Sequence, residues 1–132
     1  MKFAPSGTTR QERKDQLRRD RATAQVLRTA FPELQHLRIE LRFHGAGSSA
    51  PTPQSHLLYP PAPAFFEYRC PYSDCDGQFD LGSAVKTAIA DAQHQAQGAL
   101  VCRGSRGVDP SSRRPCLLQL NYEVTATYQQ ER

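Results

Sequence analysis

Long hydrophobic runs are missing from the 132-residue sequence, which also has no tryptophan and a single methionine. A helix that crosses a bilayer needs about 20 consecutive apolar residues, so the sequence excludes an integral helical membrane protein. The first twenty residues also lack the apolar stretch of a secretory signal, and we therefore expect a cytoplasmic protein. Hydrophobic residues make up 38% of the chain, which is enough for one small domain with a thin core.

Sequence motifs of the common enzyme classes are absent as well. The chain contains no Walker loop, no Gly-x-Gly-x-x-Gly, no His-Glu-x-x-His and no Gly-x-Ser-x-Gly, and its cysteines lack the His-x-Glu partner of zinc deaminases. Asp74, Asp76 and Asp80 fit turn and capping positions, because Asp side chains bond to nearby backbone N–H groups. We therefore expect a protein without catalytic activity. The alternative is a cysteine nucleophile with a distant histidine.

Positive charge exceeds negative charge, and it is concentrated at the two ends of the chain. Residues 1–42 hold ten Lys or Arg against five acids, residues 43–100 hold two against five, and residues 101–132 hold five against three, within a net charge of +4. Such an asymmetry is typical of surfaces that bind phosphates, although exposed charge often serves only solvation.

The first part of the chain predicts a flexible start followed by a helix. Residues 1–8 carry no periodic pattern, and we expect a single domain over residues 9–132. Thr9 and Glu12 have the spacing of a capping box. Apolar residues at helical spacing continue as far as Phe31, and Pro32 then ends the helix because the residue before a proline avoids the helical conformation.

Four later segments have the composition of strands. Residues 37–43 alternate between apolar and polar side chains, and residues 116–128 do so again over a longer stretch. Residues 64–70 and 99–103 are shorter strands. Residues 50–63 contain five prolines, which lack the N–H that a central strand needs, and are expected to form an extended surface loop.

A second helix is predicted from Ser83 to about Gln97, with Gly98 as its C-cap. The elements then follow the order α-β-β-α-β-β. We expect an α+β fold, in which two helices lie on one side of an antiparallel sheet of about four strands, because this is the simplest way to bury the apolar stripes.

Four cysteines are the most informative residues of the sequence: Cys70, Cys75, Cys102 and Cys116. Each lies at the end of a predicted strand or across a turn from one, so neighbouring strands bring all four sulfurs to one end of the sheet. Thiolates are soft ligands, and four of them complete the tetrahedron of a structural zinc ion. We therefore expect a four-cysteine Zn²⁺ site on which the fold of this thin core depends.

The sequence is also compatible with other states of the same cysteines. Cys102 and Cys116 are placed for a disulfide across a hairpin, although cytosolic thiols are kept reduced. The cysteines can also be ordinary buried side chains without a ligand. One of four histidines can replace a cysteine as ligand: His36, His44, His56 or His94.

The turn sequence CPYSDC, together with Cys102 and Cys116 on a hairpin, resembles a zinc ribbon or a related zinc-stapled β domain over about residues 66–122. In zinc ribbons the cysteines of each pair are usually separated by about two residues. Here four residues separate the first pair and a whole hairpin loop separates the second. The resemblance implies a metal-held scaffold of a kind that often docks on nucleic acid or protein.

Two basic surfaces are candidates for binding nucleic acid or a nucleoprotein through phosphate contacts: the N-terminal helix and the Arg-rich hairpin loop. Their candidate residues are Arg13, Lys14, Arg18, Arg19, Arg21, Arg103, Arg106, Arg113 and Arg114. The alternative function is a protein–protein adaptor that uses an apolar patch in the Pro-rich loop. That patch consists of His56, Leu57, Leu58 and Tyr59. We expect no membrane partner.

Overall fold

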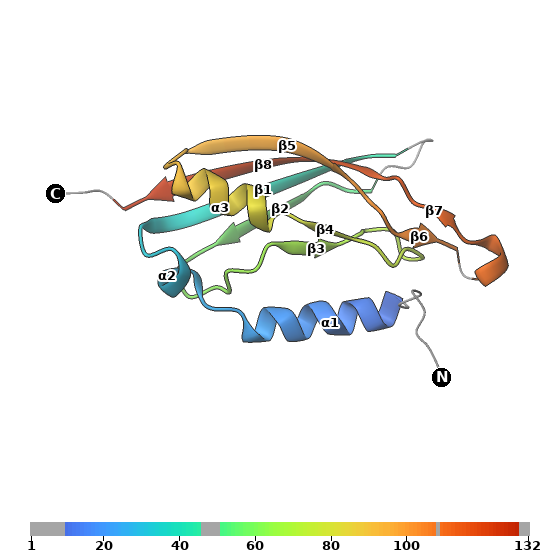
Figure 1. Ribbon diagram of the computed structural model, residues 1–132. Helices are drawn as coiled ribbons and strands as arrows, with labels where there is room; N and C mark the ends of the chain where they lie inside the picture. The colour runs from blue at the N-terminus through green and yellow to red at the C-terminus, as the bar shows by residue number, and fades with distance from the viewer. Residues whose placement is uncertain (1–9, 46–50, 108, 130–132) are drawn as a thin grey trace.

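A four-stranded antiparallel sheet is the largest element of the computed structural model, which describes residues 10–45, 51–107 and 109–129 (Figure 1). Its strands lie in the order β2-β1-β8-β5. They are β2 (Gln54–Leu58), β1 (Leu34–His44), β8 (Gln119–Tyr128) and β5 (Gln95–Val101). The two longest strands, β1 and β8, are therefore neighbours in the middle of the sheet.

Alternation of apolar and polar residues gives the sheet one buried face. In β1, Leu37, Ile39 and Leu41 are fully buried, and Ile39 lies opposite the buried Val124 of β8. Because successive side chains of a strand point to opposite faces, the intervening residues of both strands lie on the other face. The core therefore packs against one face, and we call the opposite one the open face.

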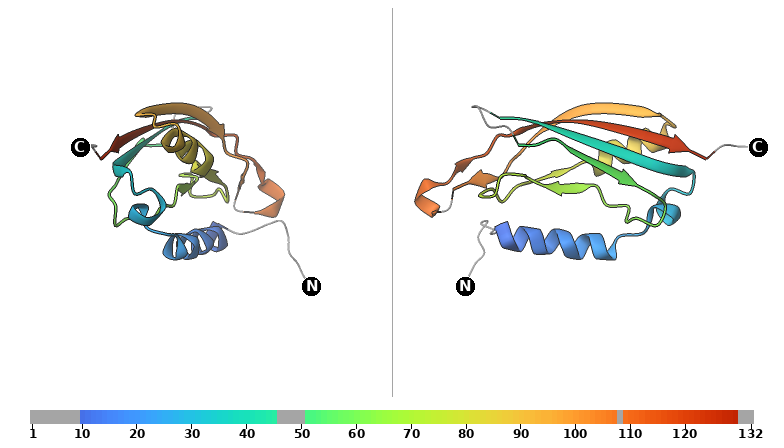
Figure 2. Two further views of the ribbon diagram at one scale, coloured as in Figure 1. Left: turned by 60° about the vertical axis from the view of Figure 1, so that its left-hand side comes forward. Right: turned by 180° about the vertical axis from the view of Figure 1, so that it is seen from behind.

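The α-helices and a small hairpin lie on the buried side of the sheet (Figures 1 and 2). The helices are α1 (Arg10–Thr23), α2 (Leu27–Ala30) and α3 (Gly82–Ala90), and a 3-10 helix, η1 (Pro110–Ser112), follows later. Two hairpins pair β3 (Glu67–Arg69) with β4 (Gln78–Asp80) and β6 (Ser105–Arg106) with β7 (Arg114–Pro115). The β3–β4 hairpin separates the sheet from α1, which packs against β3. In the described ranges, no helix is long and apolar enough to span a membrane.

The α+β class and the four-stranded antiparallel sheet are confirmed, but the order and number of elements differ from the prediction. The described residues form three α-helices instead of two, because the first predicted helix breaks after Thr23. Val26 forms a β-bridge with Pro63, and the N–H of Leu27 donates to the carbonyl oxygen of Ala62 at 2.8 Å. Pairing with this distant segment overrides the local helical pattern. The predicted flexible start at residues 1–8 lies outside the described residues.

The second predicted helix is too long, since α3 ends at Ala90 and residues 95–101 form β5. Ala92 has a positive φ of 53°, which ends the helix and turns the chain back toward the sheet. A run of alanine and glutamine satisfies both the helical and the alternating pattern, so the sequence alone did not separate them.

The structure differs from the prediction in two further segments. The Pro-rich segment 50–63 contains β2, an edge strand whose five residues include no proline. Residues 64–70 were predicted as a strand of the main sheet, but only Glu67–Arg69 is extended, and it pairs with β4 in a separate hairpin. The prolines therefore flank β2 instead of interrupting it, which is compatible with a position at the sheet edge.

His56 joins the sheet to this hairpin. Its ring stacks on that of Tyr68 in β3, with 4.6 Å between the ring centroids, and one ring nitrogen lies 3.0 Å from Oε1 of Gln54. Burial, assisted by the positive charge of Arg21, lowers the pKa of His56 from its usual value of 6.5. Protonation of His56 therefore opposes folding.

Acidification is expected to destabilise the protein through His56. Because the folded state holds the pKa of His56 below 6.5, the unfolded state binds the proton more readily. The contribution of His56 to stability is therefore complete above about pH 6.5 and is lost as the pH falls below that value. Urea denaturation of His56→Gln should show a smaller loss of unfolding free energy on acidification than the wild type shows. His44→Gln, at an exposed position, is the control, and an unchanged pH dependence in His56→Gln contradicts the prediction.

Candidate metal centre

Four cysteine sulfurs meet where the two hairpins join the sheet. The Sγ atoms of Cys70, Cys75, Cys102 and Cys116 all lie within 4.8 Å of one another. Cys70 Sγ is 3.8 Å from Cys116 Sγ, and Cys75 Sγ is 3.6 Å from Cys102 Sγ. This set of donors can hold a metal ion, as the sequence predicted.

Backbone hydrogen bonds of the hairpins and of the sheet position the cysteines. Cys102 follows β5, and its N–H donates to the carbonyl oxygen of Leu118 at 2.8 Å, while the N–H of Cys116 donates to that of Gly104 at 2.9 Å. The β5–β8 pairing thus continues past both strand ends. On the other side, the N–H of Cys70 donates to the carbonyl oxygen of Gly77 at 3.0 Å. Each half of the cluster is therefore fixed by backbone hydrogen bonds.

A backbone N–H two residues further along the chain points at each sulfur. The N–H of Gly77 donates to Cys75 Sγ at 3.3 Å, and that of Gly104 donates to Cys102 Sγ at 3.4 Å. The contact with Cys102 raises the pKa of Cys70 and burial raises the pKa of Cys116, and hydrogen bonds from the N–H groups of Tyr72 and Leu118 partly offset these two rises. Donors of this kind stabilise thiolates, the form of cysteine that binds metals.

The cluster concentrates negative charge on one sulfur. Hydrogen bonds from Cys70 and then Cys75 lower the pKa of Cys102 to about 4. The same contact with Cys102 raises the pKa of Cys70, and burial raises that of Cys116. Without a cation the four thiols thus favour a single thiolate, because further negative charges at this distance repel one another. A bound cation removes that repulsion and allows all four to ionise.

Gly77 and Gly104 allow the two halves of the cluster to approach. A side chain on Gly77 would collide with Cys102 Sγ and come within 3.0 Å of the backbone of Gly104. A side chain on Gly104 would in turn collide with the backbone of Gly77. Neither glycine has a positive φ, so the requirement is for space alone.

Three of the residues predicted to bind nucleic acid contact the loops around the sulfurs. Arg106 pairs with Asp74 at 2.9 Å and lies 3.7 Å above the ring centroid of Tyr72. Arg113 pairs with Asp76 at 2.6 Å. Arg13 of α1 reaches the same loop, with its Nε donating to the carbonyl oxygen of Asp76 at 3.1 Å.

Of the other six predicted cations, three line a groove and three are exposed elsewhere. Lys14, Arg18 and Arg21 line a groove of about 430 Å³ between α1 and β3, together with Arg69, which the sequence analysis did not select. Arg69 was missed because it stands in the alternating pattern of a short strand. The other three cations are exposed: Arg19 on α1, Arg103 after β5, and Arg114 in β7.

The four residues of the predicted adaptor patch lie in or next to β2. His56 and Leu58 are half-buried, whereas Leu57 is 44% exposed and Tyr59 is 53% exposed. The patch is therefore divided between the two faces of an edge strand. It does not form one continuous apolar surface.

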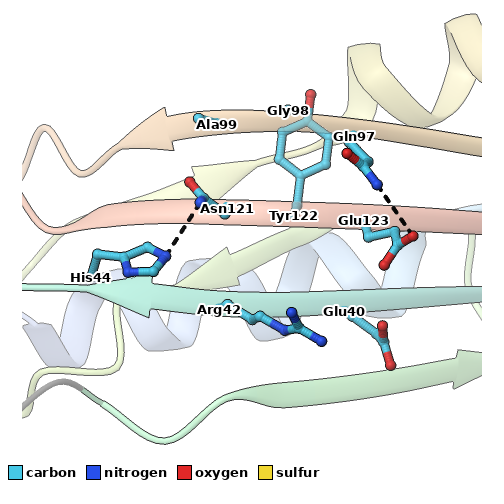
Figure 3. A pocket seen from close by; sticks show the side chains of 9 residues that line it. All are labelled: Glu40, Arg42, His44, Gln97, Gly98, Ala99, Asn121, Tyr122 and Glu123. Carbon is cyan, nitrogen blue, oxygen red and sulfur yellow. Dashed lines mark hydrogen bonds between the residues drawn. The ribbon is translucent and has the colours of Figure 1, made fainter.

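A shallow cleft of about 650 Å³ crosses the open face of the sheet over β1, β8 and β5 (Figure 3). Its polar side chains largely contact each other. Asn121 Nδ2 lies 3.2 Å from His44 Nε2, and Gln97 Nε2 donates to a carboxylate oxygen of Glu123 at 3.4 Å. The cleft is lined by charges of both signs, and the sequence did not predict it.

Comparison with known proteins assigns the chain to no family. No protein-family model matches the chain, and neither a curated protein nor a solved structure is significantly similar to it. The class of site therefore depends on the geometry of the sulfurs.

Substitution of Gly77 by alanine should disrupt the metal centre. The added methyl group overlaps Cys102 Sγ, and overpacking of this kind costs about 1–3 kcal/mol. Thermal unfolding should occur at a lower temperature in Gly77→Ala, and competition with a chelator should show weaker metal binding. Gly82→Ala is the control, because a Cβ there approaches no sulfur and meets only Asp80, whose Oδ1 lies 3.0 Å away and accepts a hydrogen bond from the N–H of Gly82. Equal behaviour of the two variants contradicts the proposed close contact.

Proposed function

We propose that the protein is a non-catalytic binding domain whose fold is closed by one structural zinc ion on Cys70, Cys75, Cys102 and Cys116. The observation that carries the proposal is the spacing of the sulfurs. A tetrahedral zinc ion with Zn–S bonds of about 2.3 Å separates its sulfurs by about 3.8 Å. The separations of 3.8 and 3.6 Å match that value, and the remaining pairs lie within 4.8 Å.

A ligand set of four thiolates supports a structural role for the ion. Four sulfurs complete the tetrahedron and leave no position for water or substrate, whereas catalytic zinc sites keep one position open. Zinc is also the common divalent partner of a tetrahedral four-sulfur site. None of the four cysteines forms a disulfide, so all four sulfurs are thiols that can ionise to bind the ion.

Removal of zinc should unfold the protein. Structural zinc contributes about 10–16 kcal/mol of apparent binding free energy, and a whole domain is stable by only about 5–15 kcal/mol. Native mass spectrometry should find one zinc ion per chain, and Cys70→Ser or Cys116→Ser should abolish the cooperative thermal transition. Ser73→Ala changes an exposed residue between two of the ligands and is the matched control. A wild-type transition in either cysteine variant contradicts a structural zinc ion.

The cationic groove beside α1 supports nucleic acid as the partner. Lys14, Arg18 and Arg21 follow one another at spacings of four and three residues, so they share one face of the helix, and Arg69 faces them from β3. Phosphates are bound by Lys and Arg side chains of this kind without reading of the base sequence.

The acidic content of the groove is low. Glu67 is its one acidic lining residue. Burial raises the pKa of Glu67, and its carboxylate accepts a hydrogen bond from Gln78 at 2.7 Å. Arg18 also pairs with Asp15 of its own helix at 3.3 Å. The lining residues still carry more cations than carboxylates, and this excess of positive charge attracts a phosphate backbone.

Nucleic-acid binding through the groove should depend steeply on salt. Four phosphate contacts give a slope of log K against log salt concentration of about −3 to −4, and loss of one cation should reduce that slope by about 0.7–0.9. We expect Arg18→Gln to weaken binding of a mixed-sequence oligonucleotide in fluorescence anisotropy. Arg42→Gln is the control, because it removes one exposed arginine from the open face of the sheet. Binding that ignores salt, or equal losses in both variants, contradicts the proposal.

A further inference from the structure

The two edges of the sheet differ in their protection. At one edge, β2 lies between Pro53 and Pro60, and prolines beside a short strand limit pairing with further strands. At the other edge, β5 runs for seven residues with neither a proline nor a charged residue. In the described part of the chain, β5 pairs with β8 on one side and with no strand on the other.

Two backbone hydrogen bonds identify which backbone groups of β5 face outward. The N–H of Cys102 donates to Leu118, and the carbonyl oxygen of His94 accepts from Ala126. Both residues have even numbers, and in an antiparallel pair the backbone groups of alternate residues point to the same side. The even-numbered residues of β5 therefore face β8, and the odd-numbered residues direct their N–H and C=O groups away from the sheet. These are Gln95, Gln97, Ala99 and Val101.

These outward groups are complementary to themselves. An antiparallel pair of two β5 strands, centred on Gly98, places Gln97 opposite the partner's Ala99 and Gln95 opposite the partner's Val101. Each such pair exchanges two hydrogen bonds, so all outward N–H and C=O groups of both strands are satisfied. We propose that the protein forms a two-fold symmetric dimer in which β5 pairs with β5 of a second copy and joins two sheets into one of eight strands.

The side chains fit this register. No charged residue meets a like charge, since the facing pairs on the open face combine glutamine with alanine or valine. Val101 is 44% exposed in the single chain and gains a neighbour. Gln95 and Gln97 are both held by hydrogen bonds to Glu123, so their orientation is set before pairing.

Gly98 lies at the centre of the proposed contact. A side chain there would collide with the ring of Tyr122, which reaches across from β8 to Gly98 (Figure 3). Tyr122 thus covers the place that a residue larger than glycine would fill.

A second copy fits this edge better than an unrelated peptide for two reasons. The register satisfies every outward group with the residues of β5 itself, and the uncharged strand provides no electrostatic preference for a different sequence. The proposed nucleic-acid groove lies beside α1 on the far side of the β3–β4 hairpin, so pairing through β5 leaves it accessible (Figure 2).

Proline substitution at the edge provides the test. The N–H of Ala99 faces away from β8, so Ala99→Pro removes no hydrogen bond of the single chain but two from the dimer. Sedimentation equilibrium should show a dimer for the wild type and a dissociation constant raised by about 30-fold or more in Ala99→Pro. Ser55→Pro is the matched control, because the same alternation directs the N–H of Ser55 away from β1 at the opposite edge. The thermal transition of each variant reports whether the single chain still folds.

Disulfide trapping tests the register independently. In a hydrogen-bonded pair the Cα atoms lie about 5.5 Å apart, which is within the range of a disulfide. A mixture of Gln97→Cys and Ala99→Cys should therefore cross-link faster than either variant alone. A wild-type chain that stays monomeric up to about 1 mM, equal effects of the two proline variants, or cross-linking that does not favour the mixture overturns the proposal.

Discussion

The meeting of four sulfurs is the constraint on which the rest of the structure depends. The hairpins β3–β4 and β6–β7 have strands of only two or three residues, and hairpins of that size are not stable alone in water. Cys70 and Cys75 belong to the first hairpin, whereas Cys102 and Cys116 extend the pairing of β5 with β8. A cation bound by these sulfurs would tie the hairpin layer to the sheet, and α1 in turn packs on that layer.

The arginines that contact the loops around the sulfurs and the cations that line the groove have different roles. Arg106 and Arg113 are paired with the aspartates of the loop that carries Cys75, and Arg13 connects the same loop to α1. These arginines stabilise the surroundings of the cluster and have less charge available to a ligand. Lys14, Arg18 and Arg21 of the same helix line the groove, and Arg18 also pairs with Asp15. A single basic helix thus contributes both to the metal centre and to the proposed binding surface.

Residue patterns in the sequence predicted the parts of the structure that depend on local chemistry. The alternation around Ile39 and Val124 predicted the two central strands, and the cysteine positions predicted the cluster. The sequence did not reveal that Val26 would pair with Pro63, because that contact is set by chain segments far apart. It also assigned residues 91–97 to a helix, since alanine and glutamine suit both patterns.

The clustering of charge along the sequence showed which segments are basic, but it did not show which cations are available to a ligand. Nine cations were selected from their clustering, but clustering does not show which of them meet an aspartate in the fold. Arg106 and Asp74 are 32 positions apart, and their contact depends on the bridge between Cys75 and Arg106. Arg69 belongs to no cluster in the sequence, since it stands in a short strand, and only the fold brings it beside the cations of α1.

The central position of β8 has a consequence for synthesis. Ile39 pairs with Val124, which leaves the ribosome 85 residues later, so β1 emerges long before its main partner. During that interval β2, the helices and the β3–β4 hairpin can cover its apolar side chains, but the edge of β1 that pairs with β8 stays unpaired. Non-local pairing of this kind slows folding, and the apolar surface and unpaired strand edges that stay exposed meanwhile promote aggregation. Nascent chains of this protein should therefore rely on chaperones until translation has passed β8.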